Sequence, residues 1–222
     1  MKREIITTAD GSRSIRVVDL DENYHSTHGA VQEAMHVFIQ HGLRAFSEKQ
    51  QLRIFEMGFG TGLNALLTAQ EAIQQERPIH YLGIEAFPVS SDMALSMGYE
   101  KAVSPDVAHV FAALHEAEWG SEQRISPFFT IEKIHQKIEE YSPTSSSIDL
   151  IYFDAFGPRA QADIWDITVL EKMAKLLVPG GLFVTYCAKG QLKRDLKSLG
   201  LTVESLPGPP GKREMTRAWK PA

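Results

Sequence analysis

Hydrophobic and polar positions follow different patterns on either side of residue 50. The first stretch, "EIITTADGSRSIRVV" (4–18), places two β-rich runs around Asp10-Gly11, which predicts a β-hairpin because that pair favours a tight turn. A segment with helical spacing follows, and its apolar face is formed by Val31, Met35, Phe38 and Ile39. We expect residues 1–50 to form an N-terminal extension made of this hairpin and helix.

From Leu52 onward, short apolar runs alternate with segments of helical spacing. The apolar runs predict strands at 52–57, 79–84, 128–131, 149–154 and 181–185. The segments between them predict helices at about 62–76, 90–97, 105–118, 133–141, 161–177 and 189–199. Because Pro and Gly at 207–211 interrupt regular structure, Leu201–Leu206 and Met215–Trp219 should pair as antiparallel strands. Residues 51–222 therefore predict an α/β Rossmann-like domain, a seven-stranded, mostly parallel sheet with helices on both faces.

Composition places the chain in a broad class. No apolar run approaches the roughly 20 residues of a membrane span, and the N-terminus lacks the apolar core of a signal peptide. The single cysteine, Cys187, cannot form an internal disulfide, so we expect a cytoplasmic protein in which Cys187 is a small buried residue. We do not expect the chain to bind a membrane.

Charge is distributed unevenly along the chain. The formal net charge of −5 argues against a general nucleic-acid coat protein. Residues 189–222, however, carry eight basic and three acidic groups, so that their formal charge is +5 and the rest of the chain carries −10. This asymmetry is compatible with a polyanion at one end of the molecule and equally with a solvated surface. Lys212 and Arg213, in the glycine-proline loop, are the candidate phosphate contacts.

Three glycines alternate with other residues in "FEMGFGTGLNAL" (55–66), directly after the first strand of the expected sheet. Glycine lets a backbone approach a ligand closely and tolerates positive φ. A dinucleotide fingerprint would need a glycine where Leu63 stands, and the Gly-Lys-Ser/Thr of a phosphate loop is absent. Glu56-x-Gly58-x-Gly60-x-Gly62 instead resembles motif I of S-adenosylmethionine-dependent methyltransferases, in which the helix N-terminus meets a methionine carboxylate.

Two acidic residues end later strands of the same sheet. Glu85 lies 23 residues after Gly62, at the tip of the second strand, where a carboxylate can accept both ribose hydroxyls. Asp154 ends the buried strand in "IDLIYFDAFGP" (148–158), at the edge where open α/β folds bind ligands. There a carboxylate can bind an alkylammonium, accept its proton and orient the nitrogen for methyl transfer. Helix capping is the structural alternative for Asp154. Together with the strand rhythm, these features are similar to the class I methyltransferase fold.

Longer segments resemble one family. "GFGTGLNALL", "FDAFGPRAQADIW", "PGGLFVTYCAKGQLKRDLKSLGL", "GPPGKREMTRAW" and "YHSTHGAVQEAMHVFI" resemble segments of the methyltransferase part of the bacterial bifunctional MnmC family, which makes 5-methylaminomethyl-2-thiouridine in tRNA. The resemblance covers the chain from about residue 20. It implies S-adenosylmethionine-dependent methylation of the primary amine of 5-aminomethyl-2-thiouridine at the wobble position, with the tRNA anticodon region as partner.

The resemblance also implies roles for single residues. The residues expected at the methionine end of the cofactor are Glu56, Gly58, Gly60, Gly62 and Asn64, while Glu85 should hold the ribose. Tyr24 and Ser26 match polar positions near the cofactor mouth. Asp154 should face the acceptor amine, with Phe156 available to stack on a base and Pro158 to stiffen the loop.

Two departures from the family qualify this expectation. The bifunctional members carry an oxidase domain beyond the point at which this chain ends, so we expect the methyl step alone, with the amine supplied by a separate oxidase or another amine-forming enzyme. In "FFTIEKIHQKI" (128–138), Lys133 stands where an acid usually accepts from adenine. We interpret Lys133 as an exposed residue at a helix start, which leaves Glu132 or a backbone carbonyl for adenine.

Other classes of function remain open. A polyamine aminopropyltransferase shares the sheet and an Asp at the same strand end, and a catalytically inactive module that binds RNA or a protein would keep only the fold. His25, His28, His36 and His41 are near in sequence but lack metal-ligand spacing, so no metal is expected.

Overall fold

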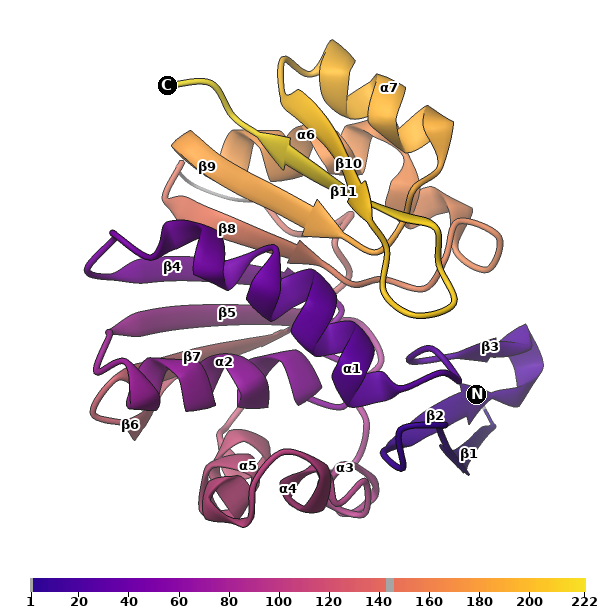
Figure 1. Ribbon diagram of the computed structural model, residues 1–222, viewed down its shortest axis with the longest axis vertical. Coiled ribbons are helices and arrows are strands. Elements are labelled where there is room, and N and C mark those ends of the chain that lie inside the picture. The colour runs from indigo at the N-terminus through magenta and orange to yellow at the C-terminus, as the bar shows by residue number, and fades with distance from the viewer. Residues whose placement is uncertain (1, 143–145) are drawn as a thin grey trace.

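The computed structural model describes residues 2–142 and 146–222 and centres on one large mixed sheet (Figure 1). Within the described residues the sheet has eight strands in the order β10-β11-β9-β8-β4-β5-β7-β6. Their bounds are β4 Leu52–Met57, β5 Ile79–Glu85, β6 Glu122–Ser126, β7 Phe129–His135, β8 Ile148–Phe153, β9 Leu177–Thr185, β10 Thr202–Pro207 and β11 Glu214–Trp219. The five inner strands β9, β8, β4, β5 and β7 are parallel, and β6, β10 and β11 add antiparallel edges.

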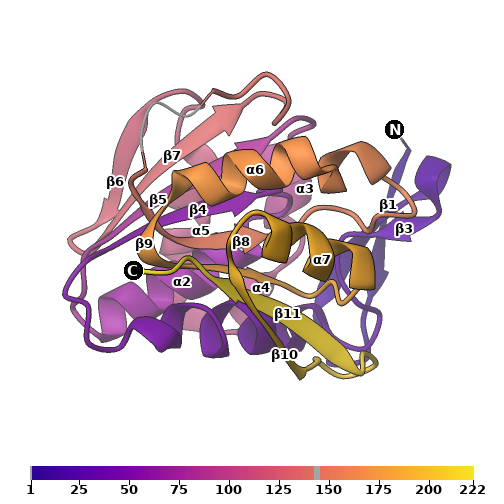
Figure 2. The same ribbon diagram turned by 90° about the horizontal axis from the view of Figure 1, so that it is seen from above.

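Helices cover both faces of this sheet (Figure 2). One face carries α1 Ala30–Ala34, the π-helix η2 Met35–Gln40, the 3-10 helix η3 Leu43–Phe46, α2 Leu63–Gln74, α3 Ser91–Leu95, α4 Tyr99–Ala102, the 3-10 helix η4 Pro105–Val107 and α5 Ala108–Glu116. The other face carries the 3-10 helix η5 Ala162–Trp165, α6 Ile167–Leu176 and α7 Gly190–Ser198. The α/β class and the mostly parallel sheet agree with the prediction from the sequence.

Alternate residues of the central strands pack into two separate cores. In β8, Leu150 and Tyr152 join the core under α2 and η2, whereas Ile151 and Phe153 join the core under α6 and α7. All six residues of β8 are buried, as expected for a parallel strand covered on both faces. The carboxyl ends of these strands therefore form one rigid edge on which functional residues can be positioned.

The N-terminal residues form the expected hairpin and helix. β1 Arg3–Thr7 and β2 Arg13–Val17 pair in antiparallel fashion, and Gly11 adopts a φ of +82° in the turn between them. A short η1 helix, Val18–Leu20, leads to β3 Glu22–Asn23, which pairs with β2. The helix that follows starts as α1 and continues as the π-helix η2, and Phe38 and Ile39 are buried as predicted. The division of the chain at residue 50 stays a prediction.

Two expectations for residues 119–141 are wrong. The helix predicted at 133–141 does not form, because the strand β7 continues to His135 and turns follow it. The polar edge strand β6 had no apolar run that would have revealed it. Lys133, expected at an exposed helix start, is 2% exposed and lies within β7. Its Nζ donates to the carbonyl oxygens of Leu114 and His115 at 2.8 and 3.3 Å, so that it ties β7 to the end of α5.

The C-terminal strands confirm their prediction, since β10 and β11 form an antiparallel pair across the glycine-proline loop. β11 pairs in turn with β9. None of the helices in the described part of the chain has the length and apolar character that crossing a bilayer requires.

Candidate active site

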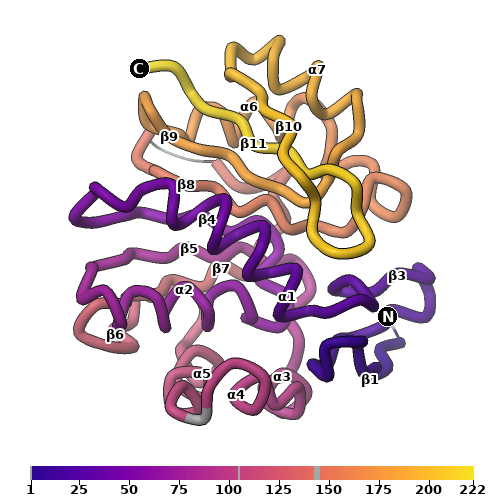
Figure 3. Tube along the Cα trace, in the orientation of Figure 1, coloured from indigo at the N-terminus to yellow at the C-terminus, as the bar shows by residue number. Residues whose placement is uncertain are grey.

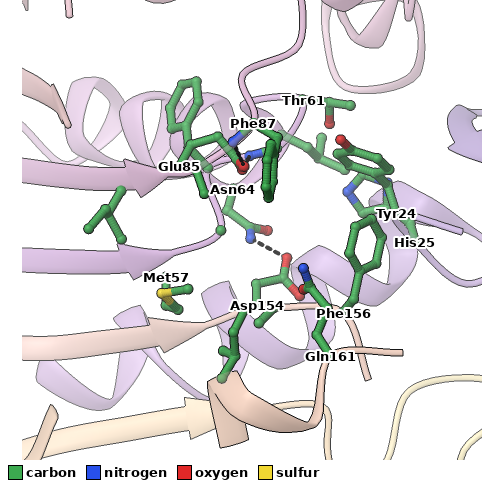
Figure 4. A pocket seen from close by; sticks show the side chains of 18 of the residues that line it. Tyr24, His25, Met57, Thr61, Asn64, Glu85, Phe87, Asp154, Phe156 and Gln161 are labelled. Atoms are coloured by element: carbon green, nitrogen blue, oxygen red, sulfur yellow. Dashed lines mark hydrogen bonds between the residues drawn. The ribbon is translucent and has the colours of Figure 1, made fainter. Parts of the chain in front are cut away.

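A cleft of about 730 Å³ lies at the carboxyl ends of β4, β5 and β8 (Figure 4). The loops after these three strands line it, and Tyr24 and His25 approach from the N-terminal segment. Gln136, after β7, completes the lining, so the cleft gathers residues from the N-terminal segment and from the ends of four strands of the central sheet.

The glycine loop forms one wall of the cleft. Gly58, Gly60 and Gly62 all have positive φ, at +89°, +52° and +73°. A Cβ on Gly58 would lie 2.7 Å from the carbonyl oxygen of Asp154, and a Cβ on Gly60 would lie 3.2 Å from the Tyr24 ring. Gly62 precedes α2 without a side-chain cap, so the helix begins with its backbone N–H groups available at the cleft. Position 58 of the loop therefore accepts only glycine.

Glu85 ends β5 and is fixed by the backbone on both sides. One carboxylate oxygen accepts from the N–H of Gly60 at 3.0 Å, and the other accepts from the N–H of Phe87 at 2.8 Å. Each oxygen keeps a further lone pair, so the carboxylate can still accept from a pair of hydroxyls in the cleft.

Asn64, in the first turn of α2, connects two carboxyl groups. Its Nδ2 donates to Glu56 Oε1 at 2.9 Å and to Asp154 Oδ2 at 2.8 Å, the second bond being drawn in Figure 4. Asn64 Oδ1 and Glu56 Oε2 are buried and have no partner within the described protein. The three side chains therefore form a unit in which Asn64 orients Asp154, and of the two unpartnered atoms Asn64 Oδ1 belongs to a residue that lines the cleft.

The burial of these carboxyls changes their proton affinity. Removal from water, with a further contribution from Glu33, raises the pKa of Asp154 to about 7, while the hydrogen bond from Asn64 and the charge of Lys212 oppose the rise. Burial also raises the pKa of Glu56 well above its ordinary value of 4.5, against the hydrogen bond from Asn64. Asp154 can consequently both hold and release a proton near neutral pH, whereas burial favours the neutral form of Glu56.

Phe156 and its neighbours form the side of the cleft beyond Asp154. The Phe156 and Tyr24 rings meet edge to face with centroids 5.0 Å apart. Trp165, which is buried, donates from Nε1 to the Phe156 carbonyl oxygen at 2.7 Å and so fixes this loop. Gln161 also lines the cleft. This side combines aromatic surface with a single carboxylate.

Six residues proposed from the sequence lie outside the lining of the cleft: Glu56, Gly62, Ser26, Pro158, Lys212 and Arg213. Glu56 is bonded to Asn64 behind the cleft, and Gly62 precedes α2. Ser26 donates its N–H to Glu33 and accepts from the N–H of His28, and Pro158 is half-buried in the turn after Phe156. Lys212 pairs with Glu33, and its Nζ lies 3.8 Å from the centroid of the Tyr186 ring. Arg213 is exposed.

Reasoning from the sequence missed several residues of the cleft, among them Phe87, Gln136 and His25. Phe87 follows Glu85 by two positions and is 46% exposed, although it is a large apolar side chain. Gln136 follows β7, in a segment that was expected to be helical. His25 was interpreted from the sequence as a surface histidine or one with its hydrogen bonds satisfied. Its Nδ1 shares a hydrogen bond of 3.1 Å with Ser14 Oγ, and burial lowers its pKa to about 4. The strand assignment of β7 would have revealed Gln136.

The residues present fit S-adenosylmethionine, the cofactor expected from the glycine motif. The unpartnered Oδ1 of Asn64 is an acceptor suited to a methionine ammonium, and the uncapped start of α2 is suited to its carboxylate. Glu85 is suited to a ribose. Neither Lys133 nor Glu132 lines the cleft, and Gln136 does. Among the described residues, no group of three histidine, cysteine or acidic side chains is arranged to hold a metal ion.

Comparisons with known proteins agree with this fit. A family model described as S-adenosyl-L-methionine-dependent methyltransferase matches residues 100–221. The tRNA 5-methylaminomethyl-2-thiouridine biosynthesis bifunctional protein MnmC of Pseudomonas fluorescens is 29% identical over 215 residues, which cover 89% of this chain and 32% of that protein. The protein of the same name from Cupriavidus necator is 30% identical over 211 residues, again with 89% and 32% covered. The chain thus spans about a third of the length of these relatives.

A solved structure supports the fold. The crystal structure of MNMC2 from Aquifex aeolicus superposes with a TM-score of 0.79 at 22% identity, covering 100% of this chain and 72% of that chain. The superposition confirms the class I architecture predicted from the strand rhythm.

Proposed function

The chain belongs to the S-adenosyl-L-methionine-dependent methyltransferase family, and from this premise we propose that it methylates the primary amine of 5-aminomethyl-2-thiouridine at the wobble position of tRNA, giving 5-methylaminomethyl-2-thiouridine. The observation that carries the proposal is Asp154, a carboxyl in the cleft that Asn64 orients through a 2.8 Å hydrogen bond. The names of the MnmC relatives, which refer to this modified nucleoside in tRNA, support the choice of acceptor.

The glycine wall and its neighbours would hold the cofactor. When bound, S-adenosylmethionine supplies an electrophilic methyl group on a sulfonium. We assign the methionine end to the backbone at Gly58, Gly60 and Gly62 and to the Asn64 amide supported by Glu56. We assign the ribose to Glu85, and the adenine to Phe87 and Gln136 in place of the acid that Lys133 replaces. Tyr24 closes the cofactor mouth, and Ser26 supports this segment from outside the cleft.

Asp154 prepares the acceptor nitrogen. An alkylammonium has no lone pair, and a carboxylate beside it attracts the cation and orients it. With a pKa of about 7, Asp154 can accept one N–H proton at neutral pH, which leaves a neutral amine with its lone pair available. Asn64 keeps the carboxylate in place during this transfer, since its Nδ2 is bonded to Glu56 as well.

The wobble base and the anticodon would lie on the Phe156 side of the cleft. Phe156 offers an aromatic face to a base, Pro158 stiffens its loop, and exposed Arg213 offers a phosphate contact. A separate oxidase or another amine-forming enzyme would supply the free amine, and the reaction would take place in the cytoplasm.

The decisive experiment is a methyl-transfer assay. The protein is incubated with S-adenosylmethionine labelled on the methyl group and with tRNA that carries the free aminomethyl group, and the RNA is digested to nucleosides. The expected result is label in 5-methylaminomethyl-2-thiouridine. Unmodified tRNA, which lacks the amine, is the control and should remain unlabelled.

Other outcomes would contradict the proposal. If no label enters RNA, and the protein instead transfers an aminopropyl group from decarboxylated S-adenosylmethionine to a polyamine, the protein is an aminopropyltransferase. Binding of tRNA without any transfer would identify a module that has lost catalysis.

A further inference from the structure

The loop between β10 and β11 contacts the N-terminal segment at three points, and the tube in Figure 3 shows the two segments side by side. His36 Nε2 lies 2.9 Å from the Pro207 carbonyl oxygen. Gly211 packs so closely on the His28 ring that a Cβ at this position would overlap it. The third contact is the ion pair between Lys212 Nζ and Glu33 Oε2.

The ion pair joins a buried carboxylate to a partly exposed ammonium. Glu33 is 7% exposed, and its second carboxylate oxygen accepts from the Ser26 N–H at 3.0 Å. Lys212 also lies over the Tyr186 ring, at 3.8 Å from its centroid. Tyr186 Oη donates to the carbonyl oxygen of Ala155 at 2.8 Å. This chain of contacts therefore ends at the residue next to Asp154.

We propose that Glu33 and Lys212 are positioning residues of the methyl-transfer site, an ion pair that holds the C-terminal loop against the N-terminal segment and controls the charge on Asp154. The inference rests on the proposed function in so far as Asp154 is the group that handles the amine. It gives Lys212 a role other than the phosphate contact expected from the sequence, since the Lys212 ammonium is already engaged by Glu33 and Tyr186.

The two members of the pair act on Asp154 in opposite directions. The Glu33 carboxylate raises the pKa of Asp154, in addition to the larger effect of burial, and the Lys212 ammonium lowers it. Other titratable groups couple electrostatically to Asp154 or line the same cleft. They come from β4, β5, α4, the N-terminal segment and the residue after β9: Glu56, Tyr81, Glu85, Tyr99, Tyr24, His25 and Tyr186. Of the groups that shift the pKa of Asp154, only Glu33 and Lys212 belong to an ion pair with each other.

Because the two variants should shift the pKa of Asp154 in opposite directions, a loosened loop alone cannot explain the expected result. Both Lys212→Met and Glu33→Gln break the same ion pair. Lys212→Met removes a cation and should raise the midpoint of the Asp154 titration by roughly one pH unit, whereas Glu33→Gln removes an anion and should lower it by a similar amount. The measurement is the ¹³C chemical shift of the Asp154 side-chain carboxyl against pH in the full chain, assigned by its loss in Asp154→Asn.

Activity provides the second readout. The acid limb of kcat/KM for methyl transfer should move to higher pH in Lys212→Met and to lower pH in Glu33→Gln. Lys212→Arg keeps the charge and should restore the limb. Lys193→Met is the matched control, because Lys193 pairs with Glu214 at 2.8 Å in the same C-terminal region, and it should shift neither readout.

Three results would overturn the inference: no shift in either variant, shifts of the same sign, or an equal shift in Lys193→Met. If Lys212→Met does not fold, the direction of the Glu33→Gln shift decides by itself. The carboxyl titration needs no tRNA, so a chain that fails to methylate the aminomethyl nucleoside would refute the proposed function and leave this test intact.

Discussion

At the scale of single residues, the proposed role of Asp154 in proton transfer conflicts with the stability of the folded protein. Its folded pKa of about 7 lies above the ordinary value of 3.8. For a carboxyl with a raised pKa, the stabilising contribution is full below pH 3.8 and is lost as pH rises through about 7, because the buried group must then ionise. Under the proposed function, the site keeps a costly charge at the position where it would handle an amine, as functional sites often do.

Replacing Asp154 with Asn should therefore separate these two properties. The amide is of similar size and cannot accept the amine proton, so we expect methyl transfer to fall by about 10²–10⁴-fold with cofactor affinity nearly unchanged. The melting temperature of the Asn variant should exceed that of the wild type above pH 7, and the difference should shrink as pH falls below that value. Steady-state kinetics, calorimetric binding of the cofactor and thermal melts across pH measure all three.

Two results would contradict this account of Asp154. Full activity in Asp154→Asn would remove the residue from proton transfer. An equal loss of cofactor affinity would instead place Asp154 among the groups that bind S-adenosylmethionine.

At the scale of elements, the turn between β4 and α2 carries the cofactor assignment, and Gly58 is its most constrained position. Gly58→Ala introduces a Cβ at a φ of +89°, only 2.7 Å from the Asp154 carbonyl oxygen. The loop and the end of β8 must then move apart, so we expect S-adenosylmethionine affinity to fall at least tenfold. Equilibrium binding of the cofactor, measured by calorimetry, gives the answer.

Gly200→Ala separates backbone strain from crowding. Gly200 has a φ of +85°, a Cβ added there would have no atom within 4 Å, and the residue follows α7 away from the cleft. This variant should lose about 1–2 kcal/mol of stability from the left-handed conformation and keep its cofactor affinity. Equal affinities in the two variants would show that the loop does not contact the cofactor.

Elements with a strong apolar pattern were predictable from the sequence, and those without one were not. The buried runs at Leu52–Met57 and Ile148–Phe153 determine their strands by composition alone, because both of their faces are covered. In β7, polar Glu132 and Lys133 conceal a strand, since the Lys133 ammonium is satisfied by carbonyl groups of α5 that lie far away in sequence. Only tertiary packing supplies that compensation, which local periodicity cannot show.

The same limit applies to the site. Glu85 and Asp154 could be placed because parallel strands bring their carboxyl ends to one edge. The hydrogen bonds from Asn64 to Glu56 and Asp154 could not be predicted from the sequence, because they depend on the start of α2 lying close to the ends of both strands. Lys212 was proposed as a phosphate contact on the basis of charge, and its ion-pair partner Glu33 is 179 positions away in the sequence.

At the scale of the whole molecule, ion pairs engage three of the eight basic residues of the C-terminal segment. Lys212 pairs with Glu33, and two further cations of this segment pair with Glu214 and Glu204. Glu214 and Glu204 already count in the formal charge of +5 of residues 189–222, so the pair with Glu33 is the one that lowers this charge, to +4. Arg213, next to the ion pair and exposed, is the remaining candidate on the glycine-proline loop for a phosphate contact.

Arg213→Ala should consequently weaken tRNA binding without affecting the chemistry. Loss of one phosphate contact raises the KM for tRNA severalfold and reduces the slope of log K against log salt by about one, because one fewer counterion is released. The turnover number and the affinity for S-adenosylmethionine should stay the same. Arg124→Ala is the matched control, since Arg124 is also exposed but lies on β6, at the opposite edge of the sheet. If Arg124→Ala reduces the salt slope as much as Arg213→Ala does, net charge rather than a contact at this loop governs the encounter with tRNA.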